Sequence, residues 1–219
     1  SATTAMSGTY TITVTASNGC TSTKSTTATV NALPTAGITN DDGTTELTCT
    51  QTEINVTATG GSTYAWSGGS STNTAANSFS SAATYTVTVT DGNSCTDTES
   101  ITITSNTTAP TATASNSGPV CVATSLSLTG GASGQTSYAW TGPNSFTSSS
   151  QSPTVSSSAS TAMSGTYTIT VTASNGCTAT ATTSPTVNAL PTAGITNNDA
   201  TTELTCTQTS ISVTGTGAG

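Results

Sequence analysis

The sequence predicts an all-β protein made of tandem immunoglobulin-like β-sandwich domains. Three observations support this prediction: apolar residues at every second position, one central tryptophan in each of two related segments, and turn-forming residues at regular intervals. Threonine and serine are abundant, and threonine is β-branched, which suits a pleated and half-solvated strand. The period-two pattern also argues against a disordered, threonine-rich stalk.

Charge is scarce and one-sided. Lys24 is the only cationic side chain and no histidine is present. Nine Asp and Glu residues bring the net charge to −8. Proteins that bind nucleic acids need a basic footprint to displace counterions from phosphates, and this sequence has none. An anionic membrane surface would repel the chain, and no apolar run approaches the ~18 residues of a membrane-spanning helix. We therefore expect no nucleic-acid partner and no membrane insertion.

A long internal repeat organises the sequence. Residues 1–62 return at 158–219 with few substitutions, at an offset of 157 (158 minus 1), and Ser7–Thr15 returns unchanged. A weaker repeat inside this unit relates Tyr64–Gly68 to Tyr138–Gly142. Such near-identity indicates recent duplication within a longer array.

This repeat predicts two complete domains between two partial ones. The proline-containing joints Asn31–Pro34 and Asn106–Pro110 are short, so we expect neighbouring domains to be held end to end in an elongated rod. The expected segments are 1–31 (C-terminal part of a domain), 32–107 (complete), 108–188 (complete) and 189–219 (N-terminal part of a domain).

Alternating apolar residues place the strands of each complete domain. In 32–107 the strands are expected around Ala36 and Ile38, Ile54 and Val56, Tyr64 and Trp66, Tyr85 to Val89, and Ile101 and Ile103. In 108–188 they are expected around Leu126 and Leu128, Tyr138 and Trp140, and Tyr167 to Val171.

Four of the six cysteines are expected to staple these small cores. A domain of this size is marginal without a covalent staple. We predict the disulfides Cys49–Cys95 and Cys121–Cys177, at the end of each sandwich; each closes a loop of about 50 residues, which contributes on the order of 4 kcal/mol.

The remaining cysteines, Cys20 and Cys206, are expected to pair with partners outside this segment. Metal binding by the cysteines is disfavoured because the sequence contains no Cys-x-x-Cys pair and no histidine. Disulfides indicate an extracellular location.

The motif Ser7–Thr15 followed by Ser17–Thr21, with an upstream Tyr-x-Trp-(Ser/Thr)-Gly, resembles the Ig-like and PKD-like repeats of giant Bacteroidota cell-surface proteins, among them gliding adhesins. The resemblance covers nearly the whole chain. It implies a bacterial, extracellular or cell-surface location, export by the type IX secretion system, and a role in adhesion, surface structure or matrix.

Catalysis is not expected, because no histidine base is present and the carboxylates are scattered. Calcium is a weak candidate ligand for Asp41, Asp42 and Glu46, but the repeat replaces Asp41 with Asn198 and so removes one carboxylate. The alternative for this loop is an Asx-type turn. No other cofactor is expected.

The sequence thus predicts a structural repeat segment of an extracellular fibre or adhesin stalk, which gives length and stiffness. The expected partners are neighbouring repeats, with polysaccharide or another cell surface bound through domains outside this segment. Two alternatives remain: a carbohydrate-binding array that uses Trp66 and Trp140 as platforms, and a self-assembling filament subunit completed by strand addition between chains. Threonine-rich outer faces are expected to carry O-linked glycosylation.

Overall fold

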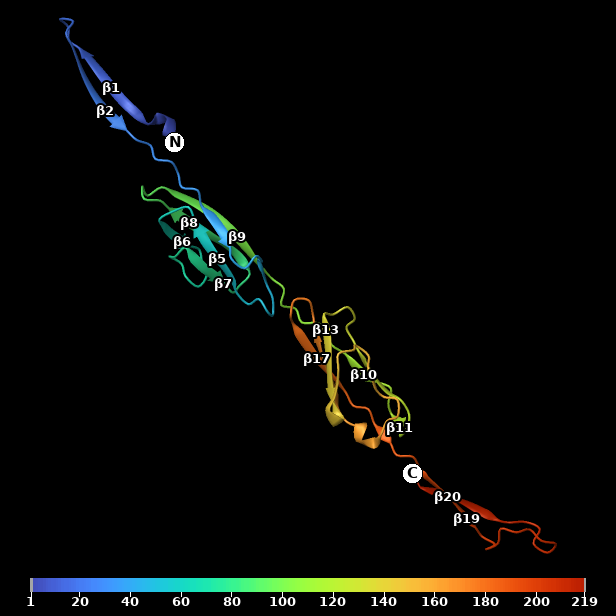
Figure 1. Ribbon diagram of the computed structural model, residues 1–219. Helices are drawn as coiled ribbons and strands as arrows, with labels where there is room; N and C mark the ends of the chain where they lie inside the picture. The colour runs from blue at the N-terminus through green and yellow to red at the C-terminus, as the bar shows by residue number, and fades with distance from the viewer. Residues whose placement is uncertain (1, 219) are drawn as a thin grey trace. The chain divides into compact units, whose positions relative to one another are not determined.

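The computed structural model describes residues 2–218 and is built almost entirely of β-strands (Figure 1). It divides into two compact units, residues 1–107 and 108–219. Each unit contains one complete sandwich domain and one separate two-stranded hairpin. The expected all-β class of immunoglobulin-like sandwiches is confirmed.

The first unit opens with an N-terminal hairpin, which we define as residues 4–30. A short 3-10 helix, η1 (Thr4–Met6), leads into β1 (Gly8–Thr15), which pairs antiparallel with β2 (Thr21–Ala28). Strict alternation of Thr with Tyr, Ile and Val along β1 puts the large apolar side chains on one face of this hairpin.

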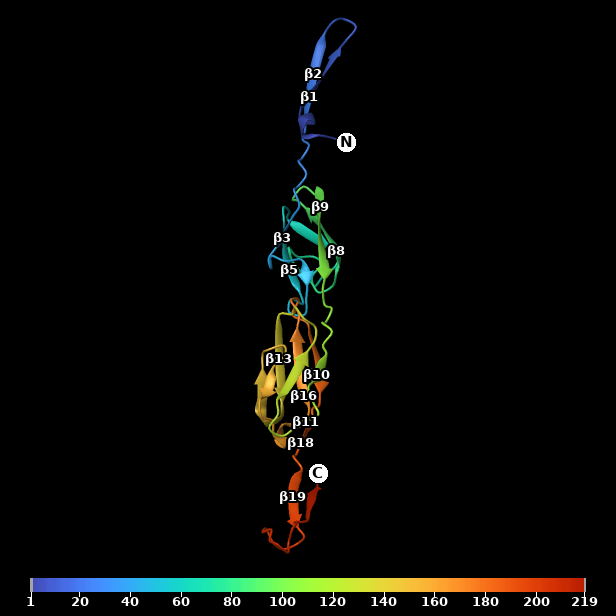
Figure 2. The ribbon, with the colours of Figure 1, turned by 90° about the vertical axis from the view of Figure 1, so that its right-hand side faces the viewer.

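The remainder of the first unit is a two-sheet sandwich (Figures 1 and 2). One sheet has the order β3-β5-β7 and the other the order β4-β9-β8-β6. The only parallel pairing of this domain joins β4 to the far end of β9, at Glu46↔Thr104 and Leu47↔Ser105. The strands are β3 (Gly37–Asn40), β4 (Glu46–Leu47), β5 (Ile54–Thr59), β6 (Thr63–Trp66), β7 (Ala76–Phe79), β8 (Ala83–Thr90) and β9 (Thr96–Ser105).

The inward residues of both sheets form a single core. Phe79 contacts the Trp66 ring edge-on, with centroids 5.6 Å apart, and stacks on Tyr85 at 3.8 Å. Such aromatic pairs stabilise by more than their buried area alone. The buried apolar residues are Leu47, Ile54, Val56, Ala58, Trp66, Phe79, Val87, Val89 and Ile103.

The complete domain of the second unit has the same two-layer plan. Its sheets have the orders β10-β12-β15 and β14-β13-β16-β17, with a short parallel pair β11-β18. The elements are β10 (Ala114–Asn116), β11 (Val120–Cys121), β12 (Leu126–Gly130), β13 (Ser137–Gly142), η2 (Pro143–Ser145), β14 (Phe146–Ser148), β15 (Thr154–Ser156), η3 (Thr161–Met163), β16 (Tyr167–Thr172), β17 (Thr178–Thr183) and β18 (Val187–Asn188).

Strand β16 lies at the centre of this second core. Tyr167, Ile169 and Val171 are each completely buried, together with Leu128 and Trp140. The Phe146 ring contacts Tyr167 edge-on at a centroid distance of 5.5 Å.

The chain continues into a C-terminal hairpin, which we define as residues 192–218. It consists of β19 (Thr192–Asn197) and β20 (Val213–Ala218), paired antiparallel from Thr192↔Ala218 to Asn197↔Val213. It corresponds by the 157-residue repeat to the β3–β5 pair of the first sandwich, which has the equivalent register at Gly37↔Thr59 to Asn40↔Val56.

Candidate functional site

The cysteines are not arranged as predicted. Cys95 is a free thiol in the structure, so the predicted Cys49–Cys95 bridge is not formed. Cys49 follows β4, and its sulfur lies 4.0 Å from the carbonyl oxygen of Thr107. Cys95 comes just before the start of β9, whereas Cys49 lies near the end of this strand. β9 has 10 residues and spans roughly 33 Å. A disulfide needs Cα atoms within about 7 Å, so these two cysteines are too far apart.

The same correction applies to the predicted Cys121–Cys177 bridge. Cys121 is a free thiol in β11, where it pairs with Asn188. Cys177 precedes β17 at the other end of the sandwich, in a turn that Asn175 fixes by donating to the Thr108 carbonyl at 3.0 Å. In the first sandwich, β5 follows Cys49 and β8 precedes Cys95, and these two strands run in the same direction. The same holds in the second sandwich for β12, which follows Cys121, and β16, which precedes Cys177. The two cysteines therefore lie at opposite ends.

The six cysteines differ in their bonding state. Cys49 and Cys177 are disulfide-bonded, whereas Cys20, Cys95, Cys121 and Cys206 are free. The expectation that Cys20 and Cys206 pair with cysteines outside this segment stays a prediction. Disulfide-bonded cysteines are typical of proteins outside the cytoplasm.

The acidic loop after β3 is closed by its own hydrogen bonds. The Asn40 side-chain oxygen accepts from the backbone N–H groups of Asp42 and the next residue, both at 3.1 Å, which forms an Asx-type turn. The Asp42 carboxylate accepts from the Asn55 backbone N–H at 2.7 Å, and Asp41 accepts from the Thr57 hydroxyl at 2.9 Å. Both carboxylates thus tie the loop to β5.

The repeated loop keeps these contacts while it loses charge. Asn198 stands where the first copy has Asp41, and its side-chain amide donates to the Thr214 hydroxyl at 2.9 Å. Asp199 accepts a hydrogen bond from the backbone N–H of Ser212, as Asp42 does from the equivalent strand residue. Since the hydrogen bond survives the Asp-to-Asn replacement, the arrangement matches a structural turn.

Glu46, the third calcium candidate, lies half-buried in β4. Across residues 2–218, no group of three or more His, Cys, Asp and Glu side chains gathers closely enough to hold a metal ion. Calcium binding by this loop stays a prediction.

Both tryptophans belong to the cores. Trp66 is 5% exposed and Trp140 is 1% exposed. Their indole N–H groups donate to the carbonyl oxygens of Thr74 at 2.9 Å and Gln151 at 3.2 Å. Neither ring offers an exposed face on which a sugar would stack.

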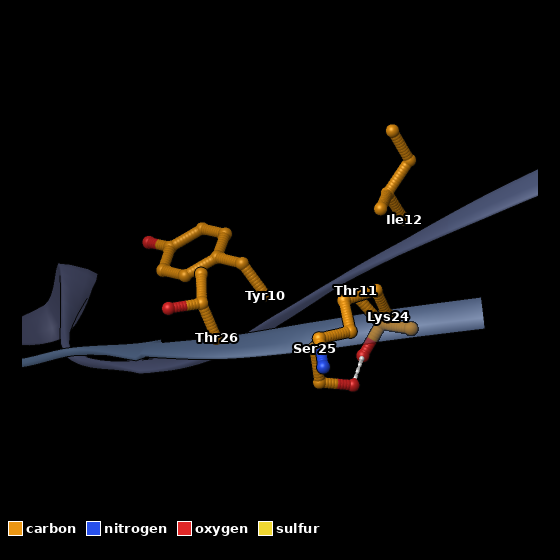
Figure 3. Close-up of a pocket in the computed structure, with 6 residues that line it drawn as sticks. All are labelled: Tyr10, Thr11, Ile12, Lys24, Ser25 and Thr26. Carbon is orange, nitrogen blue, oxygen red and sulfur yellow. Dashed lines mark hydrogen bonds between the residues drawn. The ribbon is translucent and has the colours of Figure 1, made fainter.

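The N-terminal hairpin has an uncovered apolar sheet face (Figure 3). Tyr10 and Ile12 project to one side of the ribbon, while Thr11 and Ser25 project to the other and share a hydrogen bond of 2.8 Å. Tyr10, Ile12 and Val14 are 55%, 62% and 58% exposed. We call these three side chains the uncovered face; a hollow beside it is lined by Tyr10, Ile12 and Lys24.

The C-terminal hairpin has a comparable exposed apolar set. Ile195 and Val213 are exposed, whereas their repeat counterparts Ile38 and Val56 pack in the first sandwich core. The alternation in the sequence predicted these faces, but it did not predict which copies are covered.

No protein-family model matches the sequence, and no curated protein matches it. Solved structures with similar folds include one from a study of a 1.5-MDa bacterial ice-binding adhesin, at 18% identity and a TM-score of 0.48, covering 83% of this chain and 74% of that one. Murine CEACAM1b has 10% identity and a TM-score of 0.35, with 71% and 100% covered. An amphioxus IgVJ-C2 molecule has 12% identity and a TM-score of 0.32, with 72% and 99% covered.

These similar structures are adhesin and immunoglobulin-like domains and not enzymes. Within the described residues, none of the helices has the length and apolar character required to cross a membrane.

Proposed function

We propose that this chain is a structural repeat segment of an extracellular fibre or adhesin stalk, in which successive sandwich domains supply length and stiffness. The observation that carries the proposal is the near-identical return of residues 1–62 at 158–219, an offset of 157 that spans two related domains, with polar side chains that hold their own strands and turns in both copies. Duplication of a self-contained unit adds length, and it adds no new chemistry.

The surface composition supports the same role. The outward threonines of neighbouring strands pair with one another, as Thr84 with Thr102 at 3.0 Å and Thr86 with Ser100 at 2.9 Å. These rows of hydroxyl groups form hydrogen bonds with one another on the outer face, without charged side chains. They also provide many serine and threonine hydroxyls to which O-linked sugars could be attached. Such sugars would also limit edge-to-edge association of sheets.

The location that we propose is the surface of a bacterium. The resemblance of Ser7–Thr15 and its flanking motifs to Bacteroidota surface repeats favours export by the type IX system. Disulfide-bonded Cys49 and Cys177 are consistent with an oxidising compartment.

Small-angle scattering of the purified chain tests the structural role. A compact chain of 219 residues would have a radius of gyration of about 17 Å. A stiff spacer should give a value roughly twice as large or more, with little change between low and high salt. A Pro110→Gly variant, which loosens the joint, is the matched control and should broaden the distance distribution. A radius near the compact value would contradict the proposal.

A further inference from the structure

The N-terminal hairpin has a nearly identical copy elsewhere in the chain, and that copy is covered. Residues 1–31 correspond to 158–188, and Tyr10, Ile12 and Val14 correspond to Tyr167, Ile169 and Val171. The first three are more than half exposed, whereas the second three have no exposed surface. We propose that the uncovered face binds a polypeptide segment of the kind formed by residues 108–157, which covers the copy.

The hairpin is already folded as it is in the covered copy. Tyr10 donates its hydroxyl to the Met6 carbonyl at 2.7 Å, and Tyr167 does the same to Met163 at 2.9 Å. The Ser7 hydroxyl accepts from the Val30 backbone N–H at 2.8 Å, the same distance that Ser164 has from its counterpart. A preformed surface loses little conformational entropy when it binds.

The turn of the hairpin matches as well. The Cys20 N–H donates to the Asn18 side chain at 3.1 Å, and Cys177 donates to Asn175 at the same distance. In the covered copy, the residues that complete the site come from 108–157 and are therefore known individually.

Two kinds of contact would hold the segment. In the covered domain β13 pairs with the edge of β16 that is not used by β17, from Ser137↔Thr172 to Thr141↔Thr168. The corresponding edge of β1 has no strand beside it, because β1 pairs with β2 alone among the described strands. Strand addition there would satisfy main-chain groups while Leu128 and Phe146 cover the apolar side chains.

A glycine makes the fit specific. A Cβ atom added at Gly142 would lie 2.2 Å from the Tyr167 ring, so this ring needs a glycine beneath it. Tyr10 would occupy the same place over Gly142 of the bound segment. Gly68 and Tyr85 repeat this pairing in the first sandwich, where the added Cβ would lie 3.2 Å from the ring.

Lys24 does not prevent this fit. It pairs with Ile12 across the hairpin, where the covered copy has Ala181 opposite Ile169. In the first sandwich the equivalent pair is Val87↔Glu99, and Glu99 is exposed although Val87 is completely buried. A charged side chain at this position thus remains in water in a complete domain.

The alternative occupant, the C-terminal hairpin of a second copy, fits less well. It supplies counterparts of only β3 and β5, whereas burial of β16 also uses the neighbouring β13 and the ring of Phe146. The proposal rests on the proposed role as a repeat array, since a neighbouring repeat would supply the segment. Its test is nevertheless independent of chain dimensions.

The probe is a synthetic peptide of residues 108–157, added to the full chain under reducing conditions. Hydrogen exchange with mass spectrometry distinguishes the two hairpin copies in fragments that extend from β1 to Lys24, or from β16 to Ala181, because these fragments differ in mass. We expect exchange across β1 to slow about tenfold or more. We expect no slowing with a Gly142→Ala or Leu128→Asp peptide, or when the chain carries Ile12→Asp.

Two outcomes would overturn the proposal. One is unchanged exchange across β1 at saturating peptide. The other is protection that develops without peptide as the chain concentration rises, which would identify the second copy as the occupant. If scattering gives the large radius of gyration expected of a stiff spacer but the peptide does not bind, this inference alone is rejected and the proposed function stands.

Discussion

The N-terminal hairpin and the β16–β17 pair have almost the same sequence in two different environments. Their turns, backbone register and side-chain hydrogen bonds agree closely. Their burial does not, since Ile12 is 62% exposed and Ile169 is completely buried. The comparison teaches that the hairpin geometry is encoded locally, whereas its contribution to a core depends on the segments packed against it.

The largest expected difference between the two copies is at this isoleucine. Ile169→Ala should destabilise its domain by about 2–5 kcal/mol, because it removes buried methyl groups and leaves a cavity. Ile12→Ala should change stability by no more than about 0.5 kcal/mol. Hydrogen exchange of fragments from each copy, followed across a urea titration, measures both. Equal effects at the two positions would contradict the burial difference.

The next largest effect is expected at the turn asparagine. Asn175 is buried and also holds the Thr108 carbonyl at 3.0 Å, so Asn175→Ala should cost about 1–3 kcal/mol by leaving buried polar groups unpaired. Asn18 is exposed, and Asn18→Ala is the matched control, which should lower the free energy of unfolding by only a few tenths of a kcal/mol. The same urea titration applies. A control as damaging as the test variant would argue that the turn itself, and not its burial, sets the energy.

Alkaline pH should affect the covered copy through its tyrosine. Burial raises the pKa of Tyr167 above its ordinary value of 10.0. The unfolded chain therefore ionises first, and stability should fall as the pH rises above that value and through the folded pKa. Stability measured across this range should become less pH-dependent in Tyr167→Phe. Tyr10→Phe removes the same group from the exposed copy, and an equal change there would contradict the interpretation.

The smallest expected effect concerns the third version of this strand pair, β8–β9. Hydrogen bonds from the backbone N–H groups of Ala36 and Thr98 hold the pKa of Asp97 below its ordinary value of 3.8. The stabilisation is present above that value and should disappear as the pH falls through the folded pKa. Asp97→Asn should reduce the acid sensitivity of the first sandwich. The second sandwich has Ala179 at this position and is the internal control in a hydrogen-exchange measurement.

Much of the fold was predictable because alternation is a local signal. Val87 and Val89 are completely buried while Thr88 between them faces the other side of the sheet, as the period-two pattern indicates. The central placement of Trp66 and Trp140 was likewise predictable from their position within the repeat. Alternation alone does not tell which copy of the hairpin is covered, since the same residues occur in both environments; that difference follows from the domain division, which places 1–31 in a partial domain and 158–188 in a complete one.

The cysteine pairing was wrong for a topological reason. Cys49 precedes β5 and Cys95 follows β8. The two cysteines would lie at the same end of the sandwich only if β5 and β8 ran antiparallel to each other. They run in the same direction, so the parallel β4–β9 pairing brings Cys49 to the end of β9 and away from Cys95. Sequence spacing alone does not carry the relative direction of strands in different sheets.

The placement of the cysteines at opposite ends leaves each sandwich core without an internal disulfide. Neither sandwich depends on an internal bridge, so each is able to collapse around its own aromatic core while its thiols are still reduced. Once it has folded, the roughly 30 Å between the two cysteines of a domain prevents them from pairing wrongly with each other. Mispairing inside each folded domain is therefore excluded by distance, and any disulfide made by these cysteines must reach a partner outside their own sandwich.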